Sequence, residues 1–101
     1  MAGDINPWRL MEAHAAELRA LGVRRIGVFG SFAKNEANPE SDVDVYLEFS
    51  AGMKSYNSFF AVHELLEGLF KRPIDLVTDG SLSPRKTRLI MPTIRYAAID
   101  A

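Results

Sequence analysis

The sequence predicts a mixed α/β (α+β) fold, with helices flanking a small β-sheet, in one domain over residues 1–101. Apolar residues recur at helical spacing in two segments, and three short β-favouring runs lie between or after them. The helical segments are residues 7–21 and 56–70, and the β-favouring runs are 26–29, 42–49 and 74–78. A chain of 101 residues has room for one hydrophobic core and little for a second lobe.

The composition is that of an ordinary globular domain, because 48% apolar and 25% charged residues lie far from the composition of disordered chains. The net charge of -1 gives no overall field for an anionic membrane or nucleic acid, so we expect no stable nucleic-acid binding. The absence of cysteine excludes thiolate chemistry, and any metal should have oxygen ligands. No segment resembles a membrane span or a signal peptide, so we expect a cytoplasmic protein.

The first predicted element is an amphipathic helix over residues 7–21. Its apolar positions are Trp8, Met11, Ala15, Leu18 and Leu21. Asn6 can cap the start, Pro7 suits the first helical position, and Gly22 can adopt the left-handed conformation that ends a helix.

Two strands joined by a polar loop follow this helix. Residues 26–29 form a short β-favouring run that ends at Gly30 and Ser31. Residues 42–49 alternate, and this places Asp42, Asp44, Tyr46 and Glu48 on one face of the strand. We expect that face to be polar and the strand to be half-buried.

The second half of the chain predicts a helix, a strand and a last helix. The apolar stripe of the helix at 56–70 consists of Phe59, Val62, Leu65, Leu66 and Leu69. Residues 74–78 form the third strand and residues 80–83 a turn. Ser83 and Pro84 favour the start of a final helix, which Pro92 should break or kink.

Asp42 and Asp44 are the first candidate site residues, because carboxylates two residues apart on a strand project from the same face. Without a metal their charges would repel, whereas a divalent cation between them would remove the repulsion. The alternative is a solvated strand face, which is common for an isolated Asp-x-Asp pair.

Gly30 and Ser31 strengthen the functional interpretation, since ten residues separate Ser31 from Asp42. Glycine lets a backbone approach a phosphate closely, and the serine hydroxyl can donate to a phosphate oxygen. An ordinary strand-to-loop turn is the alternative. Asp75 interrupts an otherwise apolar strand, and on a strand beside the carboxylate pair it would join the same metal site. The alternative is that an arginine or backbone donors satisfy this carboxylate.

Several other residues are of a type that could have a function. Arg85, Lys86, Arg88 and Arg95 could meet phosphate or an acidic partner, or could be solvated positions of the last helix. We expect His14 and His63 to be structural or surface residues. The aromatic residues Trp8, Tyr56, Phe59 and Phe60 fit a core or a partner interface, and Tyr46 either packs near a nucleotide or is an exposed strand tyrosine.

The combined pattern resembles the DNA polymerase beta nucleotidyltransferase superfamily. The string GSFAKNEANPESDVDVYLEF resembles in particular the minimal nucleotidyltransferases, the antitoxins of HEPN/MNT toxin–antitoxin pairs. This resemblance implies a nucleotidyltransferase fold, with a mixed sheet flanked by helices.

The resemblance also implies roles for the site residues. Asp42 and Asp44 would bind two magnesium ions, and Asp75 would help to hold the catalytic ion and could accept the proton of the attacking hydroxyl. Gly30 and Ser31 would grip the triphosphate of ATP. Many members carry arginine and glycine where this chain has Lys34 and Asn35. Lys34 either contacts phosphate or is solvated, and the grip on the triphosphate could be looser.

The resemblance implies an antitoxin enzyme that transfers AMP from ATP to a tyrosine of a HEPN toxin ribonuclease. One alternative is an antitoxin with weak or no catalysis that neutralises its toxin by binding. A small-molecule nucleotidyltransferase of the aminoglycoside type ranks last, because no substrate-binding lobe is visible. The sequence leaves the nucleotide base, the acceptor residue, the number of nucleotides transferred and the oligomeric state open.

Overall fold

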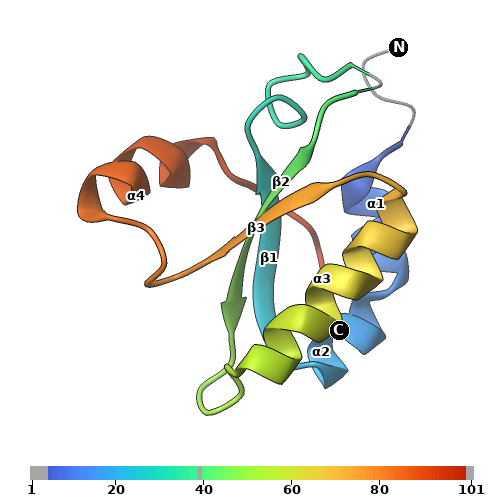
Figure 1. Cartoon of the computed structure of the whole chain (residues 1–101), viewed down its shortest axis with the longest axis vertical. Coiled ribbons are helices and arrows are strands. Elements are labelled where there is room, and N and C mark those ends of the chain that lie inside the picture. Colours follow the sequence, from blue (N-terminus) through green and yellow to red (C-terminus); the bar gives the residue numbers. More distant parts are fainter. Residues whose placement is uncertain (1–4, 39, 100–101) are drawn as a thin grey trace.

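A computed structural model describes residues 5–38 and 40–99, and it confirms the predicted α+β fold (Figure 1). In chain order the elements are α1 (Pro7–Ala13), α2 (Ala15–Ala20), β1 (Val23–Phe29), β2 (Val43–Phe49), α3 (Tyr56–Phe70), β3 (Ile74–Thr78), α4 (Pro84–Ile90), the 3-10 helix η1 (Met91–Thr93) and β4 (Arg95–Tyr96). In the described residues no helix is both long and apolar enough to cross a bilayer.

The four strands form one mixed sheet in the order β3-β2-β1-β4. Strand β1 runs antiparallel to both β2 and β4, whereas β2 and β3 are parallel and are joined through α3. Helices α1, α2 and α3 lie on one side of the sheet, and α4 lies on the other (Figure 1). The sheet therefore has one face covered by three helices and a second, more open face.

The hydrophobic core lies between the sheet and the three helices. Its largest fully buried side chains are Phe70, Met11, Leu18, Ile26, Leu47, Leu66, Ile99, Val28, Val43, Val45, Val62 and Pro7. In β2 the core residues Val43, Val45 and Leu47 alternate with Asp44 and Tyr46, which face the other side of the sheet. The acidic positions of β2 are thus turned away from the core.

The predicted helix at 7–21 is two helices, because α1 ends before His14 and α2 begins after it. The His14 ring Nδ1 lies 3.0 Å from the Leu10 carbonyl oxygen, and the His14 backbone N–H donates to Met11 O instead. This side chain competes with the helical hydrogen bond and interrupts the helix. The predicted cap is confirmed, since the Asn6 side chain accepts from the Arg9 N–H.

The prediction of a half-buried second strand is wrong at Tyr46 and Glu48, which are 3% and 5% exposed. Residues from β1 and β4 cover the part of the open face at which Tyr46 and Glu48 lie. Arg24 and Arg25 both form ion pairs with Glu48, and the Tyr96 ring meets Tyr46 edge to face. Tyr46 is therefore not an exposed strand tyrosine, and its packing near a nucleotide stays a prediction.

The last part of the chain contains a strand that the sequence did not predict. Helix α4 begins after the cap Ser83 as expected, and Pro92 lies in η1, where the α-helix has ended. Arg95 belongs to β4 and not to a helix, and its guanidinium lies 4.9 Å from the Trp8 ring centroid. A Cβ on Gly27 would lie 2.8 Å from Arg95 O, so β4 needs glycine at this position of β1.

Candidate active site

The three predicted carboxylates lie at one end of the open face. Asp42 comes directly before β2, and Asp44 is the second residue of that strand. Asp75 is the second residue of β3, and the parallel register pairs it with Asp44. Paired residues of neighbouring strands lie about 4.8 Å apart and point to the same face. The strand order on which the position of Asp75 depended is thus as expected.

Gly30 lies directly against the Asp44 carboxylate. It follows β1 at the point where Phe29 pairs with Asp44, and its φ is +72°. A Cβ on Gly30 would lie 2.2 Å from Asp44 Oδ2, which is far inside van der Waals contact. Only glycine leaves both the backbone turn and this carboxylate undisturbed.

The loop after Gly30 is held by its own backbone. The Lys34 N–H donates to Gly30 O at 3.0 Å, and the Glu36 N–H donates to Ser31 O at 2.8 Å. Within residues 5–38 and 40–99 no group forms a hydrogen bond with the Ser31 hydroxyl. A serine hydroxyl at this place can therefore donate to an oxygen of a ligand.

Lys34 and Asn35 are both exposed in this loop. Asn35 has a φ of +59°, in the left-handed region that favours glycine. The backbone at position 35 is thus left-handed, as glycine would allow without strain. Asparagine adopts this conformation more readily than most residues, and the loop keeps its shape at a modest cost.

Burial and neighbouring negative charges both act on the Asp44 carboxyl. Burial of this half-buried carboxyl raises its pKa above the usual range, and the charges of Asp75 and Asp42 raise it further. Asp75 and Asp42 are therefore both close enough to Asp44 to repel its carboxylate. A bound cation would remove this repulsion.

Carboxylate oxygens are suitable ligands for magnesium, but the three aspartates do not surround a metal ion by themselves. Among the described residues no group of three or more histidine or acidic side chains is gathered closely enough to hold a metal ion. Magnesium in proteins usually keeps several waters and is bound by one or two carboxylates together with phosphate oxygens of the substrate. Asp42, Asp44 and Asp75 match that kind of open site.

Arg72 supports the site and was missed by the sequence analysis. Its guanidinium is buried, and Nη1 donates to Asn38 O at 2.9 Å and to Ser41 O at 3.0 Å. The same group lies 5.3 Å from the Phe32 ring centroid. Arg72 thus joins the two ends of the segment that leads from Gly30 to Asp42, and no local pattern in the sequence signals this role.

A second charged network lies on β1 and β2, towards the other end of the sheet from the carboxylates. The Tyr46 hydroxyl donates to Glu48 Oε2 at 2.8 Å, and Arg25 Nη2 lies 2.6 Å from the same oxygen. Burial raises the pKa of Glu48, but the hydrogen bonds from Arg25 and Tyr46 and the arginine charges outweigh it and lower the pKa. Glu48 is therefore a structural anion.

The two histidines lie outside the candidate site, as expected, since His14 contacts Leu10 O and His63 lies 3.9 Å from Glu67.

Comparison with known proteins agrees with this geometry. The nucleotidyltransferase domain family matches residues 11–96 of the chain. Protein adenylyltransferase MntA of Thermococcus cleftensis is 38% identical over 88 residues, which cover 86% of this chain and 88% of the relative.

Two solved structures share the fold. A structure described as a minimal nucleotidyltransferase matches with a TM-score of 0.72 and 26% identity, covering 92% of this chain and 98% of its own. A second match, with a TM-score of 0.60 and 18% identity, covers 88% of this chain and 70% of its own. It comes from a complex of a tri-AMPylated HEPN toxin of Shewanella oneidensis with an MNT antitoxin, and at this identity it shows likeness of fold alone.

Proposed function

Because this chain belongs to the nucleotidyltransferase domain family, as a minimal nucleotidyltransferase related to MntA, we propose that it is an antitoxin that transfers AMP from ATP to its toxin. In this proposal residues 1–101 act as one domain, and the acceptor is a tyrosine of a HEPN toxin ribonuclease. The observation that carries the reaction class is the contact of Gly30 with Asp44 beside Asp75. It supports the proposal because Gly30, which we expect to bind phosphate, lies beside the carboxylates at one end of the sheet.

The proposed reaction needs little covalent chemistry from the protein. The acceptor oxygen attacks the α-phosphorus of ATP, the bond from that phosphorus to the bridging oxygen breaks, and pyrophosphate leaves. Asp75 accepts the proton of the acceptor hydroxyl, and Asp42 and Asp44 hold magnesium. When bound, magnesium neutralises the charge that develops on the attacking and leaving oxygens.

The loop residues would hold the triphosphate. Gly30 permits close approach of the backbone, and the Ser31 hydroxyl donates to a phosphate oxygen. Lys34 is exposed at the same loop and can add a positive charge. Since lysine lacks the two-pronged geometry of arginine, we expect a weaker grip than in relatives with arginine at this position.

The choice of acceptor is supported by the relatives. The Thermococcus protein is described as a protein adenylyltransferase, and the Shewanella complex holds an AMPylated toxin with its antitoxin.

Mass spectrometry of the intact toxin tests this function. After incubation with the antitoxin, ATP and magnesium, we expect the toxin to gain one or more adenylyl groups, and peptide mapping should place them on tyrosine. Asp44→Asn should abolish the gain, whereas Glu64→Gln, on an exposed position of α3, should not. An unmodified toxin in a sample where the two proteins bind would contradict the proposal.

Neutralisation by binding alone is the second candidate. One observation favours it, namely the lysine at position 34, because lysine lacks the two-pronged geometry of arginine. Replacing both Asp42 and Asp44 by asparagine separates the two functions. Loss of neutralisation with the complex intact would support catalysis, and full neutralisation would support binding alone.

A further inference from the structure

A pocket lies at the far end of the sheet from the carboxylates. It has a volume of about 440 Å³ and is lined by Phe49, Lys54, Ser55, Tyr56, Phe59, Thr78, Gly80 and Ser81. Thr78 is three residues along β3 from Asp75, about 10 Å away, and an odd separation places the two side chains on opposite faces. The pocket is thus separate from the candidate active site in both position and face.

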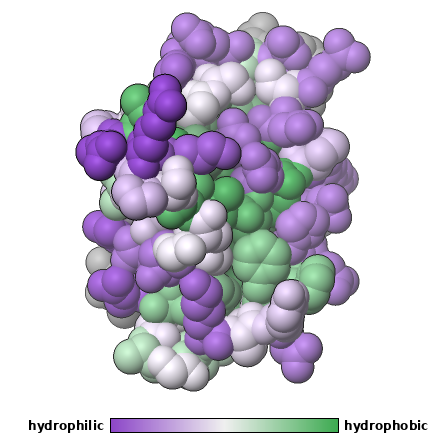
Figure 2. Space-filling model, turned by 60° about the vertical axis from the view of Figure 1, so that its left-hand side comes forward, coloured by the Kyte–Doolittle hydropathy of each residue, from purple (hydrophilic) through white to green (hydrophobic). Residues whose placement is uncertain are grey.

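The walls of the pocket are aromatic and continue onto the surface. Phe49 is buried and Phe59 is half-buried, whereas Tyr56 is 82% exposed. The Tyr56 ring stacks on that of Phe60 at 6.0 Å, and Phe60 is itself 55% exposed. Exposure of two large rings to solvent is unfavourable, and burial of these rings against another surface would be favourable. Figure 2 shows hydrophobic surface lying open on one face of the molecule, with hydrophilic residues around it.

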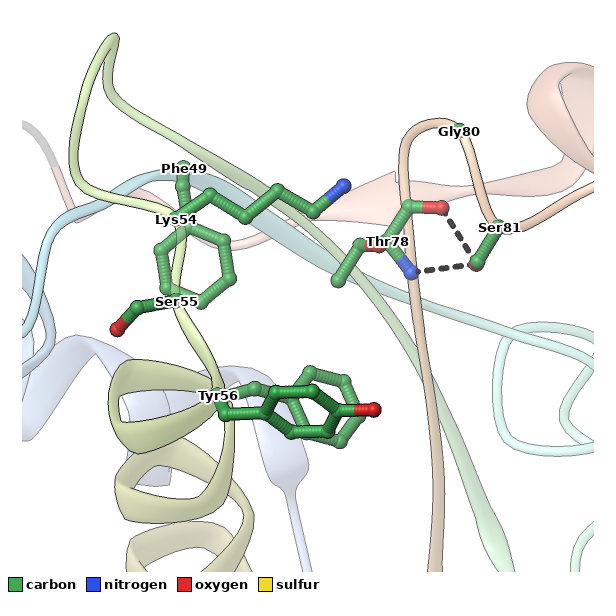
Figure 3. Close-up of a pocket in the computed structure, with 8 residues that line it drawn as sticks. Phe49, Lys54, Ser55, Tyr56, Thr78, Gly80 and Ser81 are labelled. Carbon is green, nitrogen blue, oxygen red and sulfur yellow. Dashed lines mark hydrogen bonds between the residues drawn. The ribbon is translucent and has the colours of Figure 1, made fainter.

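One cation, Lys54, lines the same pocket. Lys54 Nζ donates to Asp79 O at 2.8 Å and lies 4.0 Å from Asp79 Oδ1. An ammonium group has three protons, so donors remain for a ligand. A Cβ on Gly80 would lie 3.8 Å from Nζ, which places the charge beside the turn that follows β3. Figure 3 shows the Lys54 side chain extending across the pocket towards Thr78.

Thr78 supplies a free hydroxyl. The residue is only 4% exposed, and its backbone N–H and carbonyl are both satisfied by the Ser81 hydroxyl. Its own hydroxyl has no hydrogen-bond partner in the part of the chain that the structure describes. Since no fully buried polar side-chain atom there lacks a partner, this hydroxyl is not fully buried, and Thr78 lines the pocket. In Figure 3 the Thr78 side chain points towards Lys54 and the rings.

We propose that this pocket docks a segment of the protein acceptor that carries an aromatic side chain next to a carboxylate. The ring packs against Phe49, Tyr56 and Phe59, and the carboxylate meets the Lys54 ammonium and the Thr78 hydroxyl. This inference rests on the proposed function in one respect, namely that the docked segment belongs to the protein that accepts AMP. The volume lies within the range of ligand pockets, roughly 300–1,000 Å³.

Short peptides test the docking site without nucleotide or metal. The isotope-labelled full chain is titrated with acetyl-Asp-Phe-Asp-amide, and amide shifts are followed by NMR. We expect saturable shifts at Tyr56, Phe59 and Ser81. Acetyl-Asn-Phe-Asn-amide should bind between about twofold and fivefold more weakly, the effect of one exposed ion pair, and acetyl-Asp-Ala-Asp-amide should give no saturation.

Variants of the exposed residues complete the test. Tyr56→Ala should abolish saturation, and Lys54→Met should make the acidic and amide peptides bind equally. Lys86→Met removes a charge from α4 and should change nothing. Absence of shifts around the pocket, or equal binding of all three peptides to the unaltered chain, would overturn the docking site. Either result would leave the proposed transfer reaction standing, and a failure of transfer would not affect peptide binding.

Discussion

Asp44 is the most constrained residue of the site. Gly30 lies against its carboxylate, and Asp75 and Asp42 supply like charges nearby. A carboxyl whose pKa is raised in the folded protein binds a proton more tightly there than in the unfolded chain. Stability therefore falls as the pH rises from the ordinary carboxyl pKa to the raised one, and it remains lower above that pH. Asp44 thus reduces stability at neutral pH, as is common for residues kept for function.

Asp44→Asn should separate stability from activity. In metal-free buffer at pH 7 the variant should melt about 2–4 °C above the unaltered protein, a small gain because the carboxyl is only half-buried. Magnesium should raise the Tm of the unaltered protein and have less effect on the variant. AMP transfer should fall at least about a hundredfold. Equal Tm values with and without magnesium in both proteins would count against a metal at Asp44.

Gly30→Ala tests the turn beside that carboxylate. The added methyl group would overlap Asp44 Oδ2. The alanine would also have to adopt a φ of +72°. We expect the free energy of unfolding to fall by roughly 1–2 kcal/mol, the cost of left-handed backbone for alanine. Because the carboxylate must move, transfer should fall by more than the loss of folded protein explains. Gly52→Ala is the control, since it shares a positive φ but has open space around it.

At the scale of elements, the loop after β1 depends on a left-handed residue, Asn35. Replacement by alanine should lower the free energy of unfolding by about 1 kcal/mol, whereas glycine should be nearly neutral or stabilising. Urea denaturation of the three proteins checks this order. If alanine were as stable as glycine, position 35 would not be left-handed in solution.

Strands β1 and β2 are joined by the ion pairs of Glu48. A carboxyl with a lowered pKa stabilises the fold above its ordinary pKa of about 4.3, and this stabilisation is lost as the pH falls through the folded-state value. Glu48→Gln should therefore lose roughly 1.5–3 kcal/mol at pH 7 and depend less on pH below about 4. Urea titrations at several pH values measure both effects. A variant with the same acid dependence as the unaltered protein would show that other groups control it.

The sequence predicted elements where the signals are local. Helix α3 and strand β3 have the predicted bounds, because an apolar stripe and the flanking Lys71 to Pro73 lie close together in the chain. Strand β4 has only two residues, and it depends on Gly27 and Trp8, which are distant in sequence. The interruption at His14 comes from one side-chain hydrogen bond, which helical periodicity does not reveal.

At the scale of the whole molecule, the candidate site was predictable because its parts follow from short rules. Residues two apart on β2 share a face, and the parallel register brings Asp75 beside Asp44. Arg72 and the network around Glu48 were not predictable, since each depends on contacts between residues more than twenty positions apart. The roles of the carboxylates in catalysis remain proposals, which the variants above test.

The candidate active site and the aromatic pocket lie on opposite sides of the sheet. The carboxylates lie on the open face at one end of the sheet, and the aromatic pocket lies on the other face at the opposite end. A protein acceptor that binds at the pocket would therefore have to reach around the edge of the sheet to present its hydroxyl. This arrangement favours an acceptor segment that is long or flexible.

The most direct test of the central claim follows the phosphorus atoms of ATP. The chain is incubated with its toxin, magnesium and ATP that carries the label in either the α- or the γ-phosphate. Nucleotidyl transfer predicts that the α-label joins the toxin and that the γ-label leaves in pyrophosphate, with both events lost in Asp44→Asn. Appearance of the γ-label on the toxin, or of no label under conditions in which the two proteins bind, would contradict the account.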